Sequence, residues 1–349
     1  MRIIGISCVR DEDDIIESFV RHNLVYLDKL YVIDNLSKDR TASILTSLAS
    51  EGLAVEVWES TSCSNQQDRA ISVAVKKMAV LEPAADLVVL LDADEFLAAP
   101  DRPSFIDDLG KIDPHGYGVM PWKTYIPVED DLEHLDPAVS VTSRMTHRRR
   151  AEGYQMYKSV IPRAMFGTVR VRPGSHVVER LDGGACERTV LSSPLAHFPI
   201  RSAHQLIAKI ILFNHSRMLK KDSRPKESFH WKELAASIRA RNFRITRDEI
   251  REYALSYSVR PTDEKPTEFV YDPLPAHDSV IIKYFGNEME SLIHRFDRYI
   301  IRLQENNHIV PKEETEFEKK EFHPIGAVRE SIKQGRRWVK RRLGLSRKS

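Results

Sequence analysis

The sequence predicts an α/β protein, with a doubly wound, mostly parallel sheet followed by a helical C-terminal extension. Short apolar segments alternate with amphipathic ones through the first hundred residues, and the connections between them are short. The apolar run at 87–91, LVVLL, contains no polar side chain. A parallel strand covered by helices on both faces requires such a run.

Four strands and three helices are expected in this first part, in strict alternation. Asp11 is expected to cap the first helix, whose apolar residues recur at helical spacing from Ile16 to Leu27. Gly52 and Pro83 are stop signals for the second and third helices. The strands are expected at 2–9, 29–35, 53–60 and 87–91, and the second and third helices at 37–52 and 65–83.

The remaining chain divides by composition. Residues 111–200 read as strands and loops, 229–257 as helix, 260–278 as a proline-rich connector and 287–307 as a further helix. We therefore expect three segments: an α/β half, a second half of the same domain, and a helical extension with a basic tail. Their ranges are 1–110, 111–222 and 223–349.

Composition excludes several classes of protein. The chain has 349 residues, and its 53 basic and 51 acidic side chains nearly cancel, so no global charge favours nucleic acid. Cys8, Cys63 and Cys186 form neither a disulfide framework nor a Cys-x-x-Cys metal motif, which favours a reducing cytoplasm. Neither a signal peptide nor an apolar run long enough to span a bilayer is recognisable.

Polar residues follow each predicted strand, where ligands bind in open α/β sheets. The predicted strand at 87–91 is followed directly by Asp92, Asp94 and Glu95. A bound cation would offset the mutual repulsion of these carboxylates. Residues two apart in an extended segment face the same side, so Asp92 and Asp94 can converge on one Mg²⁺ or Mn²⁺ ion. No glycine-rich phosphate loop exists in the chain, so the ion is expected to bridge the carboxylates to a nucleoside diphosphate.

The motifs of this region resemble those of bacterial family-2-type glycosyltransferases, in the branch that carries Asp-x-Asp-Glu-Phe and a later His-Phe/Tyr-Pro element. The resemblance covers about the first hundred residues and extends more thinly to 197–209; relatives usually carry Asn-Glu where this chain has Asp11-Glu12. It implies a GT-A fold, a nucleotide-sugar donor, with a UDP-sugar favoured, and a divalent metal. It also implies that residues 1–110 are the half that binds the nucleotide sugar and that 111–222 are the acceptor-side half of the same domain. The stretches that carry it are RDEDDIIESFVRHNL, LYVIDNLSKDRT, QQDRA, LLDADEFL and HFPIRSAHQLIAK.

The resemblance implies roles for individual residues. Arg10 would lie beside the base, Asp34 near the uracil or ribose, and Asp92 and Asp94 would hold ribose and metal. Each has a structural alternative: Asp34 as the cap of a turn, for example, and the acids as solvated loop residues. Arg69 is a further donor-binding candidate or simply begins a helix.

A late histidine completes the metal shell in many GT-A enzymes, and His197 is the better candidate because HFPIRS surrounds it; His176 is the second. The alternative for both histidines is a structural role, with their hydrogen bonds satisfied inside the protein. Arg201 and Lys209, two turns apart on the next expected helix, would meet the charge of the leaving phosphate or form a solvated helix face. Asp130, in the acidic stretch PVEDDLEH, is the candidate catalytic base.

The sequence thus predicts a metal-dependent glycosyltransferase, cytoplasmic or peripheral on the inner face of the membrane, acting on a glycan or lipid-linked acceptor in bacterial surface glycan synthesis. The basic tail, with Trp338 among the basic residues of 336–348, reads as an anchor on anionic lipid or as a disordered end. Three alternatives were weighed: a metal-dependent nucleotidyltransferase, a phosphatase that uses Asp-x-Asp as nucleophile and acid, and a non-enzymatic scaffold binding membrane or nucleic acid through the tail.

Overall fold

A computed structural model describes most of the first 275 residues. The described residues are 1–60, 67–128, 138–218, 238, 240–242, 244–260, 262–275 and 282–284, with the side chains of 211–218 excepted. The predicted helix at 287–307, the basic tail and Asp130 lie outside them.

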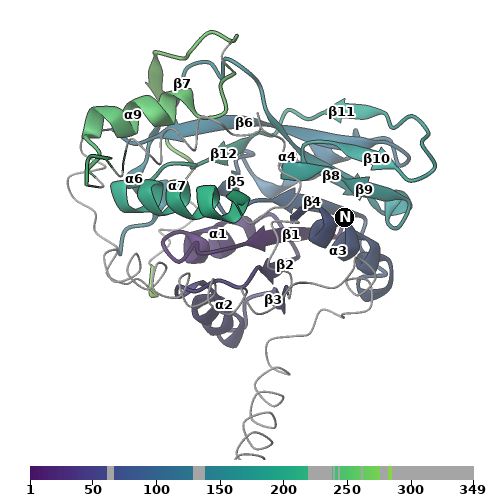
Figure 1. The fold of residues 1–349 in the computed structure, drawn as a ribbon. Coiled ribbons are helices and arrows are strands. Elements are labelled where there is room, and N and C mark those ends of the chain that lie inside the picture. Colours follow the sequence, from purple (N-terminus) through teal and green to yellow (C-terminus); the bar gives the residue numbers. More distant parts are fainter. Residues whose placement is uncertain are drawn as a thin grey trace, which may run out of the picture.

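A large mixed sheet runs through the molecule, and its main path has the strand order β13-β7-β6-β8-β4-β1-β2-β3 (Figure 1). Strands β9 and β10 pair in a separate two-stranded sheet. Strands β4, β1, β2 and β3 run parallel, whereas β8 lies antiparallel between β4 and β6. The strands of this path are β1 (Ile3–Val9), β2 (Lys29–Asp34), β3 (Val55–Glu59), β4 (Leu87–Leu91), β6 (Tyr117–Ile126), β7 (His147–Arg149), β8 (Tyr157–Pro162) and β13 (Phe269–Tyr271).

Shorter strands and the helices complete the fold. The shorter strands are β5 (Glu95–Leu97), β9 (Val169–Val171), β10 (Val178–Arg180), β11 (Arg188–Val190) and β12 (Leu195–His197). The helices are α1 (Ile16–Asn23), α2 (Thr41–Ser50), α3 (Gln67–Leu81), α4 (Arg102–Leu109), α6 (Val141–Arg144), α7 (Ala203–Met218) and α9 (Arg247–Ser256), with short 3₁₀ turns η1 (Arg163–Met165) and η2 (Pro173–Ser175). None of the helices within the described ranges is long and apolar enough to cross a bilayer.

Alternate residues of the central strands pack into two separate cores. In β1, Ile3 joins the core that α1 and α2 cover, through side chains such as Phe19 and Ile44. Its neighbour Ile4 joins the core on the opposite face, where α3 contributes Ile71. Because helices cover both faces of a mostly parallel strand set, the predicted doubly wound α/β class is confirmed.

Three local predictions differ from the structure. Helix α1 begins at Ile16 with Ile15 as its N-cap and no side-chain cap, so Asp11 does not cap it. The helix expected at 229–257 is interrupted before Thr246, whose capping box with Glu249 starts α9 afresh. The proline-rich connector contains β13, which pairs antiparallel with β7. The pairing partner of β13 lies more than a hundred residues upstream, which local sequence patterns do not register.

Candidate active site

The carboxyl ends of the parallel strands meet at one edge of the sheet, as predicted. The register aligns Val9 of β1 with Asp34 of β2, and Asp34 with Glu59 of β3. On the other side of β1, Ser7 aligns with Leu91, so Asp92 follows at the same edge. Arg10 Nε donates to the Asn35 carbonyl oxygen at 3.1 Å, which ties the first two strand ends together.

The loops after β1 and β2 hold each other through backbone N–H groups. The N–H of Asp11 donates to Ser37 Oγ, and the N–H of Glu12 to Thr41 Oγ1, at 2.9 and 2.8 Å. In return, Lys38 N–H donates to Asp11 Oδ1 at 2.6 Å. A phosphate loop would present these N–H groups to an anion. Here side-chain oxygens of the neighbouring loop already accept from them, so this acidic loop is not a phosphate cradle.

Asp34 lies at the centre of that edge and is 4% exposed. Both carboxylate oxygens accept from Ser37 N–H at 3.3 Å, so the predicted turn-capping role is present. Burial raises the pKa of Asp34 to about 6, against the effect of this hydrogen bond. Its contact with a donor stays a prediction.

Asp92 is fixed by two side chains from different elements. Lys158 Nζ, on β8, lies 2.5 Å from Asp92 Oδ2, and Gln67 Nε2, on α3, donates to Oδ1 at 2.8 Å. The Asp92 side chain is nevertheless 30% exposed. It therefore presents a pre-oriented carboxylate to the solvent side of the site.

Glu95 lies beneath Asp92 and is completely buried. Its Oε2 accepts the Asp92 N–H at 2.7 Å, and its Oε1 lies 3.2 Å from Lys158 Nζ. Burial raises the pKa of Glu95 to about 8, although the Lys158 ammonium opposes this shift. Glu95 therefore supports the turn that carries Asp92 and Asp94.

Strand pairing brings His197 beside Asp94. Strand β12 runs antiparallel to β5, with His197 opposite Glu95, and Phe198 N–H donates to the Asp94 carbonyl oxygen at 2.8 Å. His197 Nε2 consequently lies 3.7 Å from Asp94 Oδ1, and Lys209 Nζ of α7 lies 3.2 Å from Asp94 Oδ2. Although burial acts to raise it, the charges of Lys209 and His197 hold the pKa of Asp94 well below its usual range.

Aromatic packing orients the His197 imidazole. Its ring lies 3.9 Å from the Trp122 ring, centroid to centroid, at an interplanar angle of 30°. Burial lowers the pKa of His197, so the imidazole is neutral near pH 7. His176 packs edge-on against the other side of this group, 5.5 Å from Trp122, and its Nδ1 lies 2.7 Å from the Tyr157 carbonyl oxygen. His176 thus supports Trp122 and makes no contact with Asp94 among the interactions of the described residues.

Arg201 is 1% exposed and joins the first loop to the segment after β12. Its guanidinium bonds Glu12 Oε2 at 2.7 Å and Asp14 through two nitrogens at 2.7 and 2.9 Å. These acids raise its pKa although burial opposes them. Burial also raises the pKa of Glu12 to about 7, while Arg201 lowers it. Arg201 is not on the solvated helix face that was the alternative expectation; its contact with a donor stays a prediction.

Two predicted site residues are less defined. Arg69 lies in the first turn of α3, two residues after the described chain resumes at Gln67, and its donor role stays a prediction. Asp130 lies outside the described residues.

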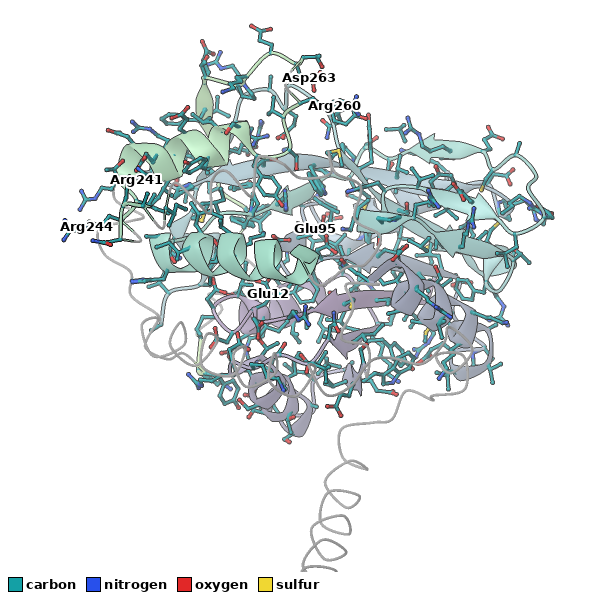
Figure 2. All side chains as sticks on the ribbon, in the orientation of Figure 1. Glu12, Glu95, Arg241, Arg244, Arg260 and Asp263 are labelled. Carbon is teal, nitrogen blue, oxygen red and sulfur yellow. The ribbon has the colours of Figure 1, made fainter. Side chains whose placement is uncertain are left out.

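Figure 2 shows Glu12 and Glu95 in the interior of the molecule near α7, whereas Arg241 and Arg260 lie on its outside. At the site, five carboxylates contact three cationic side chains: Glu12, Asp14, Asp92, Asp94 and Glu95 against Lys158, Arg201 and Lys209.

Asp94 and His197 fit a divalent cation. Two ligands that each lie about 2.1 Å from one ion are about 3 to 4 Å apart, and the measured separation is 3.7 Å. His197 Nδ1 is buried without a partner in the described chain. The imidazole is therefore oriented by packing against Trp122 and not by the usual supporting hydrogen bond. No group of three or more acidic, histidine or cysteine ligands occurs in the described ranges. Substrate phosphate and water would therefore supply the other ligands, as is usual for Mg²⁺.

Comparisons with known proteins do not assign a function to this chain. No family model matches the chain, and no curated protein matches it in sequence. Among solved structures, the mannosyltransferase PcManGT from Pyrobaculum calidifontis, in complex with GDP-Man and Mn²⁺, is 16% identical at a TM-score of 0.32, covering 67% of this chain and 69% of its own. Mannosyl-3-phosphoglycerate synthase from Rubrobacter xylanophilus is 11% identical at 0.31, covering 71% and 77%.

A third structure, from Bacillus anthracis, was assigned as a glucose-1-phosphate thymidylyltransferase and contains a sucrose. It is 10% identical at a TM-score of 0.33, covering 65% of this chain and 99% of its own. The neighbours' names include both glycosyl and nucleotidyl transfer. At these identities and TM-scores, none of the likenesses carries an argument about what this chain binds.

Proposed function

We propose that this chain is a metal-assisted glycosyltransferase that moves a sugar from a nucleoside-diphosphate sugar to an acceptor hydroxyl. The observation that supports this most is the pairing of Asp94 with His197 and Lys209 at the carboxyl edge of the parallel strands, where such sheets bind ligands. The Asp94 carboxylate and the His197 imidazole can hold a cation there, and the Lys209 ammonium can bind a phosphate oxygen.

The position of each residue gives it a different role in this proposal. Asp94 and His197 would hold Mn²⁺ or Mg²⁺, which when bound neutralises charge on the departing diphosphate. Lys209 would bind a phosphate oxygen, and Asp92, oriented by Lys158 and Gln67, would accept hydrogen bonds from donor hydroxyls. Arg10 and Asp34 would face the nucleoside. The acceptor oxygen attacks the anomeric carbon, the sugar–phosphate bond breaks, and a base takes the acceptor proton, with Asp130 as the candidate.

The first loop favours this function over nucleotidyl transfer, its main alternative. A nucleotidyltransferase must hold a triphosphate while its α-phosphate is attacked, and a loop with free N–H groups serves this purpose. In this chain the N–H groups of Asp11, Glu12 and Asp13 donate to Ser37, Thr41 and Asp39. The loop therefore offers three fewer donors to a triphosphate.

An activity panel distinguishes the two. Purified protein with Mn²⁺ should release nucleoside diphosphate from one member of a panel of UDP-, GDP- and dTDP-sugars. Nucleoside triphosphates with sugar 1-phosphates should yield no pyrophosphate. Asp94→Asn should abolish the release, whereas Asp182→Asn, at a side chain that is 59% exposed and paired with Arg180, should not. Pyrophosphate release in the second assay would establish the alternative, and activity retained by Asp94→Asn would refute the assigned site.

A further inference from the structure

A residue from the C-terminal segment reaches the candidate site. Tyr257 follows α9, and its ring lies 5.4 Å from the His197 ring, centroid to centroid, at an interplanar angle of 64°. Lys209 Nζ lies 5.5 Å from the centre of the same ring. Tyr257 is thus adjacent to both groups that flank Asp94, although it lies far from every motif recognised in the sequence.

A buried arginine fixes the backbone at this position. The side chain of Arg149, on β7, is 2% exposed, and its Nη2 donates to the carbonyl oxygens of Ala254 and Tyr257 at 2.6 and 2.8 Å. These carbonyls belong to the C-terminal end of α9, where a cation also meets the negative end of the helix dipole. The tyrosine is therefore held by the sheet itself and does not depend on a surface loop for its position.

The hydroxyl of Tyr257 has the surroundings of a ligand-binding group. Tyr257 is only partly buried, and among the described residues its hydroxyl has no hydrogen-bond partner. The hydroxyl is thus a donor without a described partner, on a ring that lies beside Lys209 and His197.

We propose that the Tyr257 hydroxyl donates a hydrogen bond to a phosphate oxygen of the nucleoside diphosphate, beside Lys209. This rests on the proposed function, and it extends the donor site to a residue of the C-terminal segment. A neutral O–H donor next to Lys209 complements an anionic oxygen, whereas the carboxylates of the site would repel that oxygen unless a cation or a donor intervened. Tyr257 is a binding residue in this assignment and takes no part in proton transfer.

Isothermal titration of the full chain tests the assignment. UDP, GDP and dTDP, and the matching nucleosides, would be titrated in the presence of Mn²⁺ into the wild type, Tyr257→Phe and Tyr271→Phe. Phenylalanine keeps the ring beside His197 and removes only the donor. Loss of a hydrogen bond to a charged group should weaken diphosphate binding about tenfold or more and leave nucleoside binding unchanged. Tyr271→Phe, at an exposed tyrosine on β13, should match the wild type.

The outcomes separate this inference from the proposed function. If the wild type binds a diphosphate and Tyr257→Phe binds it equally well, the tyrosine assignment is wrong and the proposed function stands. If Tyr257→Phe weakens nucleoside and diphosphate binding by the same factor, the effect is one of shape, and the phosphate contact is again refuted. If the wild type binds none of the diphosphates, both the assignment and the proposed function fail.

Discussion

Lys158 Nζ lies 2.5 Å from Asp92 Oδ2, and the lysine side chain is completely buried. The same ammonium lies 3.2 Å from Glu95 Oε1, so one cation serves two carboxylates. Burial opposes its charge, but Asp92 and Glu95 raise the pKa of Lys158 above its ordinary value. A buried cation of this kind is costly to desolvate and is retained only when its partners are in place.

Removing the ammonium should therefore destabilise the fold. Lys158→Met fills a similar volume but leaves Asp92 without its cation. Because the Asp92 side chain is 30% exposed, the loss should be smaller than for a fully buried pair, about 1 to 3 kcal/mol of unfolding free energy. Denaturant unfolding monitored by fluorescence would measure the loss. Lys111→Met, at a lysine that is 59% exposed and paired with Asp108, should change stability by no more than about 1 kcal/mol.

A second substitution should recover part of that loss. In Lys158→Met, changing Asp92 to Asn removes the uncompensated carboxylate and keeps an oxygen that can accept from Gln67 Nε2. The double variant should therefore be more stable than Lys158→Met alone. If it is less stable, Asp92 is not the group that the lysine compensates.

The carboxyl group of Asp34 should make stability depend on pH. Its pKa in the folded protein is about 6, above the ordinary value of 3.8 for an aspartate. The folded state therefore binds the proton more tightly, so this contribution is complete at low pH and is lost as pH rises from about 4 to about 6. Asp34→Asn should be more stable than the wild type above that window by about 1 to 3 kcal/mol, and the difference should vanish below it.

Denaturant melts of both proteins at several pH values would show this difference, which isolates Asp34 from the other titrating groups. An Asn variant with a constant stability difference across the window would contradict the shifted pKa. If Asp34 also contacts the donor, the same variant should bind nucleoside diphosphate more weakly while being more stable. Such an opposition between stability and binding is expected for a buried functional carboxylate.

The sequence allowed the α/β half to be predicted because its signals are local. Strands β1, β2 and β3 are each one apolar run followed by a helix, and LVVLL became β4 with the predicted bounds. The antiparallel half was less defined, since the position of β8 between β4 and β6 depends on pairing between distant segments. The same limit explains β13, whose three residues lie within a segment rich in proline.

The site shows the same division. Asp92, Asp94 and His197 could be identified as candidates from short motifs, and the structure brings Asp94 and His197 together. Lys158 and Tyr257 were not identified. The only signal for Lys158 was a charged residue inside an otherwise apolar strand, which is uncommon unless the charge is paired. Tyr257 reaches the site through the fold of α9 onto β7, which no local pattern encodes.

Divalent metal should bind through Asp94 and His197. His197→Ala should weaken Mn²⁺-dependent binding of nucleoside diphosphate by at least about tenfold, because loss of even a supporting residue costs that much. Titration with and without chelator measures the metal-dependent part. His115→Ala, at an exposed histidine, is the control. Equal diphosphate affinity with and without metal would contradict the metal site, whereas normal metal-dependent binding by His197→Ala would leave the histidine with a packing role against Trp122.

The basic tail should bind anionic membrane surfaces. Seven Lys or Arg residues lie between Arg336 and Lys348, interleaved with Trp338 and other apolar residues. Each basic residue near an anionic surface contributes roughly 1 kcal/mol at low salt, and burial of Trp338 adds a hydrophobic share. Deleting the residues after Gln334 should release the protein from vesicles containing phosphatidylserine, and added salt should weaken the binding of the intact chain.

Activity on a soluble acceptor analogue should survive, because Asp94 and His197 lie far upstream in the chain. Co-sedimentation with vesicles that the deletion leaves unchanged would show that other residues hold the membrane, and an intact chain that never sediments would exclude the anchor.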